Sequence, residues 1–286
     1  VDDGSTDDTP SVLQKYRGHL EYVQQANRGP SAARNRGWGL LSTDAIVFLD
    51  ADDLLLPEAL ARRLALLTGG KATWGYTEGF LQDASGGRCA FSETYPPVTD
   101  LDEDSIFSTL LCRNFITTSA MIVQRGVLEN VGGFDEAISG TEDWDLSLRL
   151  AVGHPACYEP QPTFVQRLSP NTHSRDRDRM DMMRYNTLTK AYRFYPNDVA
   201  ASGPSARRSV ADAHNWFGYT LASKGRWEEA RPFLRTSIRL WPPQGRAWWL
   251  LLRCLTAACR PARSAEQSSH GPDPCIPRSS TELGEK

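Results

Sequence analysis

The sequence predicts an α/β fold, with a mostly parallel sheet and helices on both faces, followed by a small all-α region. Through about residue 185, short apolar runs alternate with segments of helical periodicity, which is the pattern of strand–helix–strand units. Beyond that point only helical patterns occur. Of the 286 residues, 40% are hydrophobic and 23% are charged, a globular composition that argues against a disordered or fibrous chain.

The charge distribution also divides the chain in two. Residues 1–185 contain 17 Lys and Arg against 27 Asp and Glu, whereas residues 186–286 contain 15 against 8. The two parts therefore carry net charges of −10 and +7, which add up to the overall −3. The overall charge gives no reason to expect nucleic-acid binding. The six cysteines form no C-x-x-C pair and are expected to be free thiols in a reducing compartment. No apolar run is long enough to span a membrane.

The first elements are predicted from apolar runs and turn residues. Residues 1–9 are expected to form the end of a strand and a polar turn, and Pro10 then opens a helix. The apolar face of that helix consists of Val12, Leu13, Tyr16 and Leu20. A short strand, a helix capped by Ser31, a buried strand and a helix opened by Pro57 follow at residues 20–23, 31–40, 45–49 and 57–67.

Later segments add strands at residues 73–81 and 119–123 and a helix at residues 143–152. Residues 169–184 are dense in Arg and Asp and are expected to form a mobile loop whose charges neutralise one another. His173 lies in this loop, where a solvated side chain is favoured over a ligand role.

The C-terminal part has a repeat pattern. From Trp216 to Pro242 the spacing of aromatic, Gly and Ala residues matches the 34-residue tetratricopeptide pattern, and residues 245–255 resemble the first helix of another copy. From about residue 261 the sequence has no periodicity and is expected to be disordered. We therefore expect three parts: a catalytic domain at 1–185, a tetratricopeptide-like region at 186–260 that could bind a protein partner, and a tail at 261–286.

Two acidic clusters carry the predicted chemistry. Asp50 and Asp52 follow a buried strand, and ligands in open α/β sheets bind at the carboxyl ends of strands. Carboxylates at this spacing can hold Mg²⁺ or Mn²⁺ together with substrate phosphates, although a solvated turn is the favoured explanation of a lone D-x-D. Asp2 and Asp3 are expected at the end of a neighbouring strand and would face the same crevice. Arg34, on the intervening helix, can balance a diphosphate or pair with one of these carboxylates.

Five blocks resemble family 2 glycosyltransferases. They are V-D-D-G-S-T-D at residues 1–7, N-x-G-x-x-x-A-R-N at 27–35, F-L-D-A-D-D at 48–53, G-G-F-D at 132–135 and E-D-W-D-L at 142–146. The resemblance implies a GT-A fold, the fold of nucleotide-diphospho-sugar transferases, and inverting transfer of a sugar to an acceptor hydroxyl. It also implies that Asp2 and Asp3 lie near the base and ribose, that Asp50 lies near the ribose and diphosphate, and that Arg34 supports the nucleotide.

For the metal, the resemblance makes Asp52 the ligand of Mg²⁺ or Mn²⁺. For the general base we favour Asp143, at the start of a predicted helix, where a carboxylate can take the proton of an attacking hydroxyl. The alternative for Asp143 is a carboxylate that only complements the helix dipole. Glu142 and Asp145 compete for the role of base.

Family members usually begin with a strand and a helix ahead of the V-D-D block. Because the sequence starts at Val1, we expect these two elements to be missing, in a fragment of a longer enzyme or in an inactive relic whose repeat recruits partners. A nucleotidyltransferase with the same acidic crevice is a third hypothesis. The expected partners are a nucleotide diphosphate sugar and a glycan or lipid-linked acceptor. The expected location is the bacterial cytoplasm, with peripheral contact to the inner face of the membrane.

Overall fold

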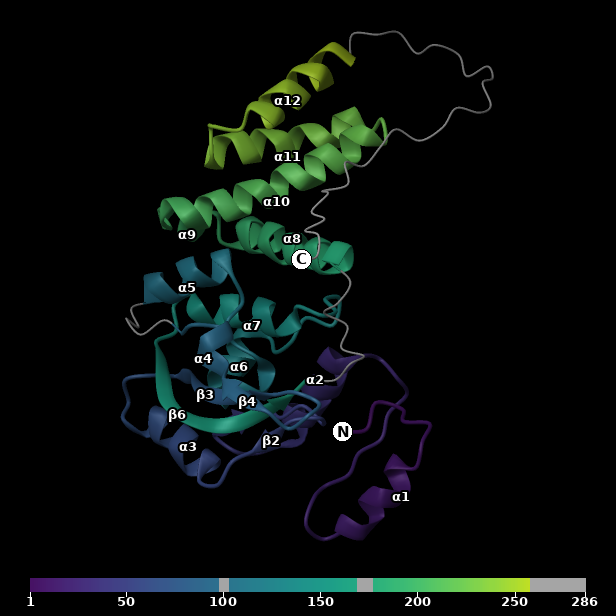
Figure 1. Cartoon of the computed structure of the whole chain (residues 1–286), viewed down its shortest axis with the longest axis vertical. Helices are drawn as coiled ribbons and strands as arrows, with labels where there is room; N and C mark the ends of the chain where they lie inside the picture. Colours follow the sequence, from purple (N-terminus) through teal and green to yellow (C-terminus); the bar gives the residue numbers. More distant parts are fainter. Residues whose placement is uncertain (98–102, 169–176, 258–286) are drawn as a thin grey trace, which may run out of the picture.

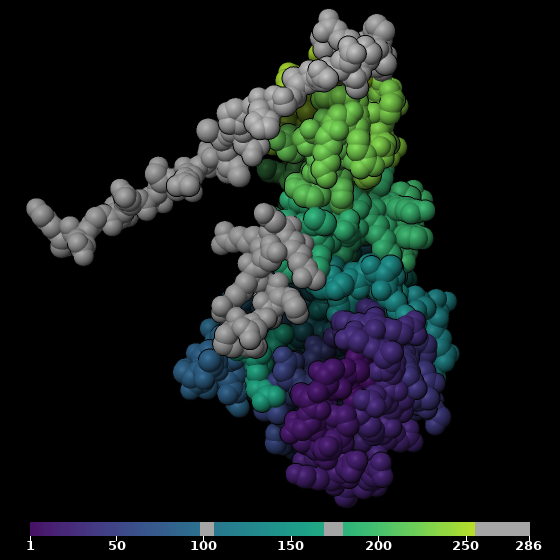
Figure 2. Space-filling model, turned by 90° about the vertical axis from the view of Figure 1, so that its right-hand side faces the viewer, coloured from purple at the N-terminus to yellow at the C-terminus, as the bar shows by residue number. Residues whose placement is uncertain are grey.

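A computed structural model of the chain describes residues 1–97, 103–168 and 177–257. In this part the molecule is elongated, with the sheet and its helices at one end and a stack of helices at the other (Figure 1). The first fifty residues lie together on one side of the sheet-containing half, and the helical stack extends away from them (Figure 2). None of the described helices is both long enough and apolar enough to cross a membrane.

The described sheet is mixed and has the strand order β1-β5-β3-β6-β2, with β4 paired to β3. The strands are β1 (Ala45–Val47), β2 (Leu54–Leu55), β3 (Trp74–Gln82), β4 (Arg88–Ala90), β5 (Met121–Gln124) and β6 (Ala156–Arg167). Only the β3–β6 pair is parallel; the other four pairs are antiparallel. The α/β class is confirmed, but the prediction of a mostly parallel sheet is wrong for these residues.

The sequence pattern did not determine the direction of the strands. The connection between β3 and β4 is a tight turn closed by Asp83, and so short a connection allows only an antiparallel pair. β5 enters the sheet between β1 and β3 and runs opposite to both. Alternating apolar runs and helices identify the elements, whereas direction depends on which strands become neighbours in space.

Helices cover the sheet on both sides. They are α2 (Pro30–Leu40), α3 (Ala59–Thr68), α4 (Phe91–Thr94), α5 (Glu103–Cys112), α6 (Arg125–Val131) and α7 (Glu142–Ala151). In Figure 1, α3 lies below the curved sheet, and α4 to α7 lie above it. Leu146, Leu148 and Leu150 of α7 are buried in one large cluster with Trp74 and Phe164 of the sheet. This packing fixes the N-terminal turn of α7, where the predicted base lies.

The N-terminal segment departs most from the sequence prediction. The expected helix is short, consisting of α1 (Thr9–Leu13) and a 3-10 turn at Gln14–Tyr16, and neither has a buried residue. Its expected apolar face is open, because Val12, Tyr16 and Leu20 are 40–51% exposed. The strand expected at residues 20–23 is reduced to isolated bridges, one of which joins Asp2 to Gln24. Apolar spacing without a surface to pack against did not produce a regular element here.

The C-terminal half consists of α8 (Arg177–Phe194), α9 (Pro196–Ala201), α10 (Pro204–Ser223), α11 (Trp227–Leu240) and α12 (Gly245–Ala257). The loop expected up to residue 184 is wrong from Arg177 onward, where α8 begins; His173 and the tail beyond 257 lie outside the described residues. The expected boundary at residue 185 falls inside α8. Leu188 and Val210 are buried in the same cluster as the sheet, so this half packs continuously onto the first.

The α10–α11 pair is packed closely at Gly218. A Cβ atom at this position would lie 2.6 Å from the Leu234 side chain, so glycine is needed where the two helices cross. A second buried cluster, including Leu234 and Leu250, joins α11 to α12. The α10–α11 hairpin and α12 occur where the repeat pattern predicted helices. The tetratricopeptide assignment stays a prediction.

Candidate functional site

An arginine joins two of the acidic blocks. Arg34 Nη2 lies 2.6 Å from Asp50 Oδ1, and Arg34 Nη1 lies 2.8 Å from Glu142 Oε1. α2 supplies the cation, the turn after β1 supplies Asp50, and the first turn of α7 supplies Glu142. Although Asp50 and Glu142 are far apart in the sequence, the two carboxylates share one guanidinium. The expected pairing of Arg34 with an aspartate of the cluster is confirmed, and the second partner was not predicted.

The surroundings of Arg34 keep it charged and oriented. Burial lowers its pKa, but the charges and hydrogen bonds of Asp50 and Glu142 outweigh this and raise it. Its guanidinium carbon lies 5.2 Å from the centre of the Phe134 ring, which in turn packs edge-on against Phe48 at 5.0 Å. The G-G-F-D loop therefore holds the arginine against the turn that follows β1.

Asp143 lies next to this bridge and has a different environment. Its Oδ1 accepts hydrogen bonds from Asn114 Nδ2 at 3.3 Å and from the backbone amide of Trp144 at 2.6 Å. Burial, followed by the charge of Glu142, raises the pKa of Asp143 to about 7. No cation within the described ranges contacts its carboxylate, whereas Glu142 is paired with Arg34 and accepts a hydrogen bond from the amide of Gly140. The raised pKa places proton exchange by Asp143 near neutral pH.

Asp145, the third acid of this block, is occupied by structural contacts. Its carboxylate lies 2.6 Å from Lys190 Nζ and 2.8 Å from Arg149 Nη2, and Lys190 also contacts Asp135 at 2.7 Å. These ion pairs tie the G-G-F-D loop and α7 to α8. With two cations on a side chain that is only 4% exposed, Asp145 is suited to holding α7 in place.

The turn from Asp50 to Asp53 is fixed by its backbone and by its last residue. The amide of Asp50 donates to Ser119 Oγ at 3.1 Å, and the amide of Asp53 donates to the Asp50 carbonyl at 3.0 Å. Asp53 Oδ1 accepts from the amide of Arg167 at 3.2 Å, and Arg167 Nε donates to the Asp52 carbonyl. The turn is thereby attached to the end of β6, and the Asp52 side chain is left pointing outward and exposed.

We tested whether this turn could hold the metal that the resemblance implies. Among the described residues no group of three or more metal-ligating side chains occurs. The Asp52 carboxylate makes no hydrogen bond or ion pair with any of them, and Asp50 is paired with Arg34. One or two carboxylates are enough for Mg²⁺ when substrate phosphates complete the shell. The donor set therefore fits a metal that arrives with its phosphates, and does not fit an all-protein cage.

The Asp2 and Asp3 carboxylates are used within the chain. Asp2 accepts hydrogen bonds from the Ser5 amide at 2.8 Å and Tyr22 Oη at 2.6 Å. Asp3 accepts from the amides of Arg28 at 3.0 Å and Gly29 at 2.7 Å, directly before α2. Asp3 thus anchors the N-terminus of the helix that carries Arg34. Contact of Asp2 or Asp3 with a nucleotide stays a prediction.

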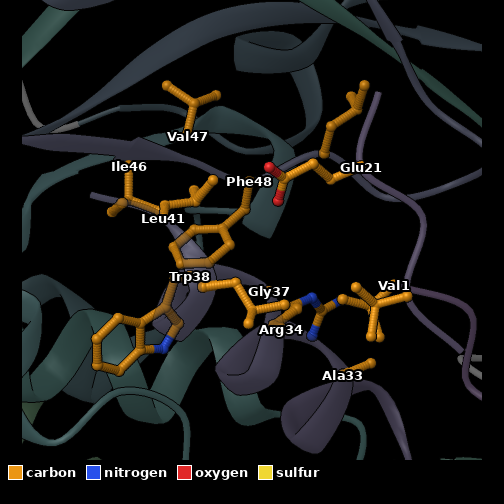
Figure 3. Close-up of a pocket in the computed structure, with 13 residues that line it drawn as sticks. Val1, Glu21, Ala33, Arg34, Gly37, Trp38, Leu41, Ile46, Val47 and Phe48 are labelled. Carbon is orange, nitrogen blue, oxygen red and sulfur yellow. The ribbon is translucent and has the colours of Figure 1, made fainter. Parts of the chain in front are cut away.

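A cleft of about 330 Å³ lies beside Arg34, between α2 and β1 (Figure 3). Ile46 and Val47 line it from β1, Trp38 lines it from α2, and Val1 and Glu21 come from the N-terminal segment. β1 stands at one end of the strand order, so it is an edge strand of the described sheet. Because the walls are mainly apolar, the acidic chemistry lies at its border, around Arg34 and Asp50.

Sequence reasoning missed several residues of the site. Glu142 was expected only as a competing base, and Asn114, Ser119 and Phe134 were not expected to touch the site residues. Asn114 lies at the end of a segment with no readable motif. The available signal was weak, since a polar residue before the buried run at residues 115–123 is also what a loop end looks like.

Comparisons with known proteins identify related sequences and related folds. Residues 1–80 match the sequence profile of Glycosyl transferase family 2. The O-antigen biosynthesis protein RfbC of Myxococcus xanthus is 32% identical over 167 residues, and the chondroitin synthase of Escherichia coli is 29% identical over 158. Each alignment covers 54% of this chain but only 12% and 22% of those relatives, so the chain spans a small part of their length.

The solved structures show the fold. The Staphylococcus aureus TarS fragment 1–349 in complex with UDP-GlcNAc superposes with a TM-score of 0.58 at 17% identity, covering 90% of this chain and 77% of that one. The mannosyltransferase PcManGT of Pyrobaculum calidifontis, in complex with GDP-Man and Mn²⁺, gives 0.51 at 21% identity, covering 90% and 75%. The fold of this chain is therefore similar to the GT-A-like fold of these two structures. The profile match at residues 1–80 and these relatives support a family 2 glycosyltransferase, as the sequence motifs predicted.

Proposed function

We propose that this chain transfers a sugar from a nucleotide diphosphate sugar to an acceptor hydroxyl with inversion at the anomeric carbon, and that Asp143 is the general base. The observation that carries the proposal is the Asp143 carboxyl, whose pKa is raised to about 7 directly beside the Arg34 bridge. A base whose pKa lies near the working pH is both deprotonated and basic enough to accept a proton.

In the proposed reaction the acceptor oxygen attacks the anomeric carbon as its proton passes to Asp143. The bond between that carbon and the diphosphate oxygen breaks, and its electron pair leaves with the nucleoside diphosphate. One sugar–oxygen bond forms and one breaks, on opposite faces of the sugar, so a single displacement inverts the configuration. Asn114 and the Trp144 amide fix Oδ1 of Asp143, leaving Oδ2 without a hydrogen bond from the described residues.

The donor side is assigned to the residues around Arg34. Arg34 and Asp50 would lie next to the ribose and diphosphate, while Asp2 and Asp3 would lie near the base and ribose. UDP-GlcNAc and GDP-Man are bound by the two structural neighbours, and the same class of donor is proposed here. The proposed acceptor is a hydroxyl of a glycan or a lipid-linked sugar, because the curated relatives are named for O-antigen and chondroitin synthesis.

Asp52 would hold Mg²⁺ or Mn²⁺ together with the donor diphosphate. When bound, the metal would supply positive charge to the leaving diphosphate. The support for this role is the exposed Asp52 carboxylate, which has no partner within the described ranges, at the end of a turn fixed by Asp53 and Arg167.

The test compares Asp143→Asn with the wild-type chain. A screen of UDP- and GDP-sugars with Mn²⁺ by calorimetry identifies a donor, and release of nucleoside diphosphate then measures turnover, with the product anomer determined by NMR. Asp143→Asn should lower turnover by about 10²–10⁴-fold while leaving donor affinity unchanged. The wild-type rate should fall about tenfold per pH unit below pH 7, as the base becomes protonated.

Two further variants separate the roles. Asp52→Asn should weaken Mn²⁺-dependent donor binding, in contrast to Asp143→Asn. Asp212→Asn is the matched control, because burial also raises the pKa of Asp212, which lies on α10, and its turnover should be unchanged. Unchanged turnover in Asp143→Asn would refute the base assignment. A wild-type chain that binds no donor would favour an inactive relic, and release of pyrophosphate would favour a nucleotidyltransferase.

A further inference from the structure

The last described helix has an exposed face that its packing does not explain. On α12, Ala247, Leu250 and Cys254 are buried against the preceding hairpin. The other side presents Trp248, Trp249 and Leu252, which are 52%, 55% and 60% exposed. These three side chains form the aromatic face of α12. At about 100° of rotation per residue they lie within roughly one third of the helix circumference, so they form one continuous surface.

Arginines border this face on one side. The Arg253 guanidinium carbon lies 4.8 Å from the Trp249 ring centre and 5.3 Å from that of Trp227, and the Arg246 carbon lies 3.8 Å from the Tyr219 ring centre. The sequence of α12 contains these two arginines and no acidic residue. Aromatic rings and guanidinium groups in contact can enter a lipid headgroup layer together, because the ring reduces the cost of removing water from the charge.

We propose that the aromatic face of α12 binds an anionic lipid surface. Trp is the residue type that prefers the boundary between hydrocarbon and water, Leu supplies apolar area, and flanking arginines attract negative headgroups. α12 lies at the end of the described molecule away from the sheet and α3, so this face can meet a flat surface without involving the Arg34 site (Figure 1).

Two other occupants fit less well. A second copy of the chain would bring the arginines of two α12 helices together without a carboxylate from either helix, which costs free energy. Residues 258–286 contain Ser, Pro and charged residues but no apolar stripe at helical spacing that could cover the face. A lipid surface meets both the apolar and the charge requirement.

The test uses the whole chain and vesicles of phosphatidylcholine with and without phosphatidylglycerol, measured by co-sedimentation. The wild-type chain should bind the anionic vesicles more tightly, and salt should weaken this binding. The double variant W249S/L252S should lose about tenfold or more in affinity, because it removes most of the apolar contact. The double variant R246Q/R253Q should lose about tenfold and should abolish the preference for anionic lipid.

The matched control is L60S/L64S on α3, whose two leucines are 58% and 49% exposed at the other end of the molecule. This control should bind vesicles as the wild type does. Equal binding of the wild type to neutral and anionic vesicles would overturn the proposal, as would equal loss in the α3 control. Gel filtration that shows an oligomer dissociating in W249S/L252S would instead assign the face to a second copy. Circular dichroism checks that each variant is folded, and transfer to a soluble acceptor should be unaffected in all of them.

Discussion

Asp2–Asp3 and Glu142–Asp143 are both pairs of adjacent acidic residues. In the fold, however, the pKa values of Asp2 and Asp143 are shifted in opposite directions. Hydrogen bonds from Ser5 and Tyr22 lower the pKa of Asp2 to about 2. Burial and the neighbouring Glu142 raise the pKa of Asp143 to about 7. The first pair is surrounded by donors and stays charged near neutral pH, whereas Asp143 has few donors and exchanges its proton there. Burial and local hydrogen-bond supply, more than residue type, decide which acid can be a base.

The bridge at Arg34 limits this difference, because its positive charge opposes the rise in the Asp143 pKa. Among the substitutions that we predict, Arg34→Met should have the largest effect on stability. It leaves Asp50 and Glu142 without their shared cation, and removing one partner of a largely buried ion pair costs about 3 kcal/mol. Chemical denaturation should show this loss, and donor binding should weaken with it.

Arg62→Met is the control for the same substitution. Arg62 pairs with Glu58 at 3.2 Å on the exposed side of α3, and such surface pairs contribute below about 1 kcal/mol. Arg34→Lys, which keeps the charge but not the fork that reaches two carboxylates, should lie between the two. If Arg34→Met were as stable as Arg62→Met, the bridge would not be what holds α2, the β1 turn and α7 together.

A second prediction concerns stability and pH at Asp143. Because its folded pKa of about 7 lies above the unfolded value of 3.8, the folded state binds this proton more tightly. The contribution of Asp143 to stability therefore falls as pH rises from about 4 to 7. Asp143→Asn removes the buried charge and should stabilise the fold at pH 8 by about 1–3 kcal/mol, with a smaller gain at pH 5 and none below about pH 4.

The nearby Asp145 gives the matched contrast. Asp145→Asn removes the partner of Lys190 and Arg149 and should destabilise the fold at both pH values. Thermal unfolding of the two variants at pH 5 and pH 8 therefore distinguishes Asp143, a buried carboxyl without an ion pair among the described residues, from Asp145, a buried carboxyl with two. Equal destabilisation by both substitutions at pH 8 would show that Asp143 is also a structural acid.

How far the sequence could predict the site follows from these same residues. Asp143 was found because it belongs to a short block at a helix start, and Arg34 because it lies on a helix between two acidic turns. Its pairing with Glu142, 108 positions away, depends on how α7 packs against α2, which no local pattern encodes. The elements predicted at residues 31–40, 45–49, 57–67, 73–81, 119–123 and 143–152 lie within about two residues of α2, β1, α3, β3, β5 and α7. α5, α6 and β6 were not predicted. The predictions of a mostly parallel sheet and of a regular N-terminal helix and strand were wrong, because strand direction and packing partners are properties of the assembled fold.

The smallest predicted effect is at the other acidic pair. Asp2→Asn keeps the shape of the side chain but weakens its hydrogen bonds with Ser5, Tyr22 and Gln24. Since the folded pKa of Asp2 lies below 3.8, its stabilisation is present above about pH 4 and is lost as pH falls toward 2. The melting temperature of Asp2→Asn should therefore be slightly below that of the wild type at pH 7, and the gap should close in acid.

Asp7→Asn, whose carboxylate binds only the nearby Thr9 amide on the exposed surface, is the control and should show a smaller gap. A gap at pH 7 that persisted at pH 2 would mean that the Asp2 charge is not what holds residues 1–5 to residues 22–24, and the contrast with Asp143 would then rest on burial alone.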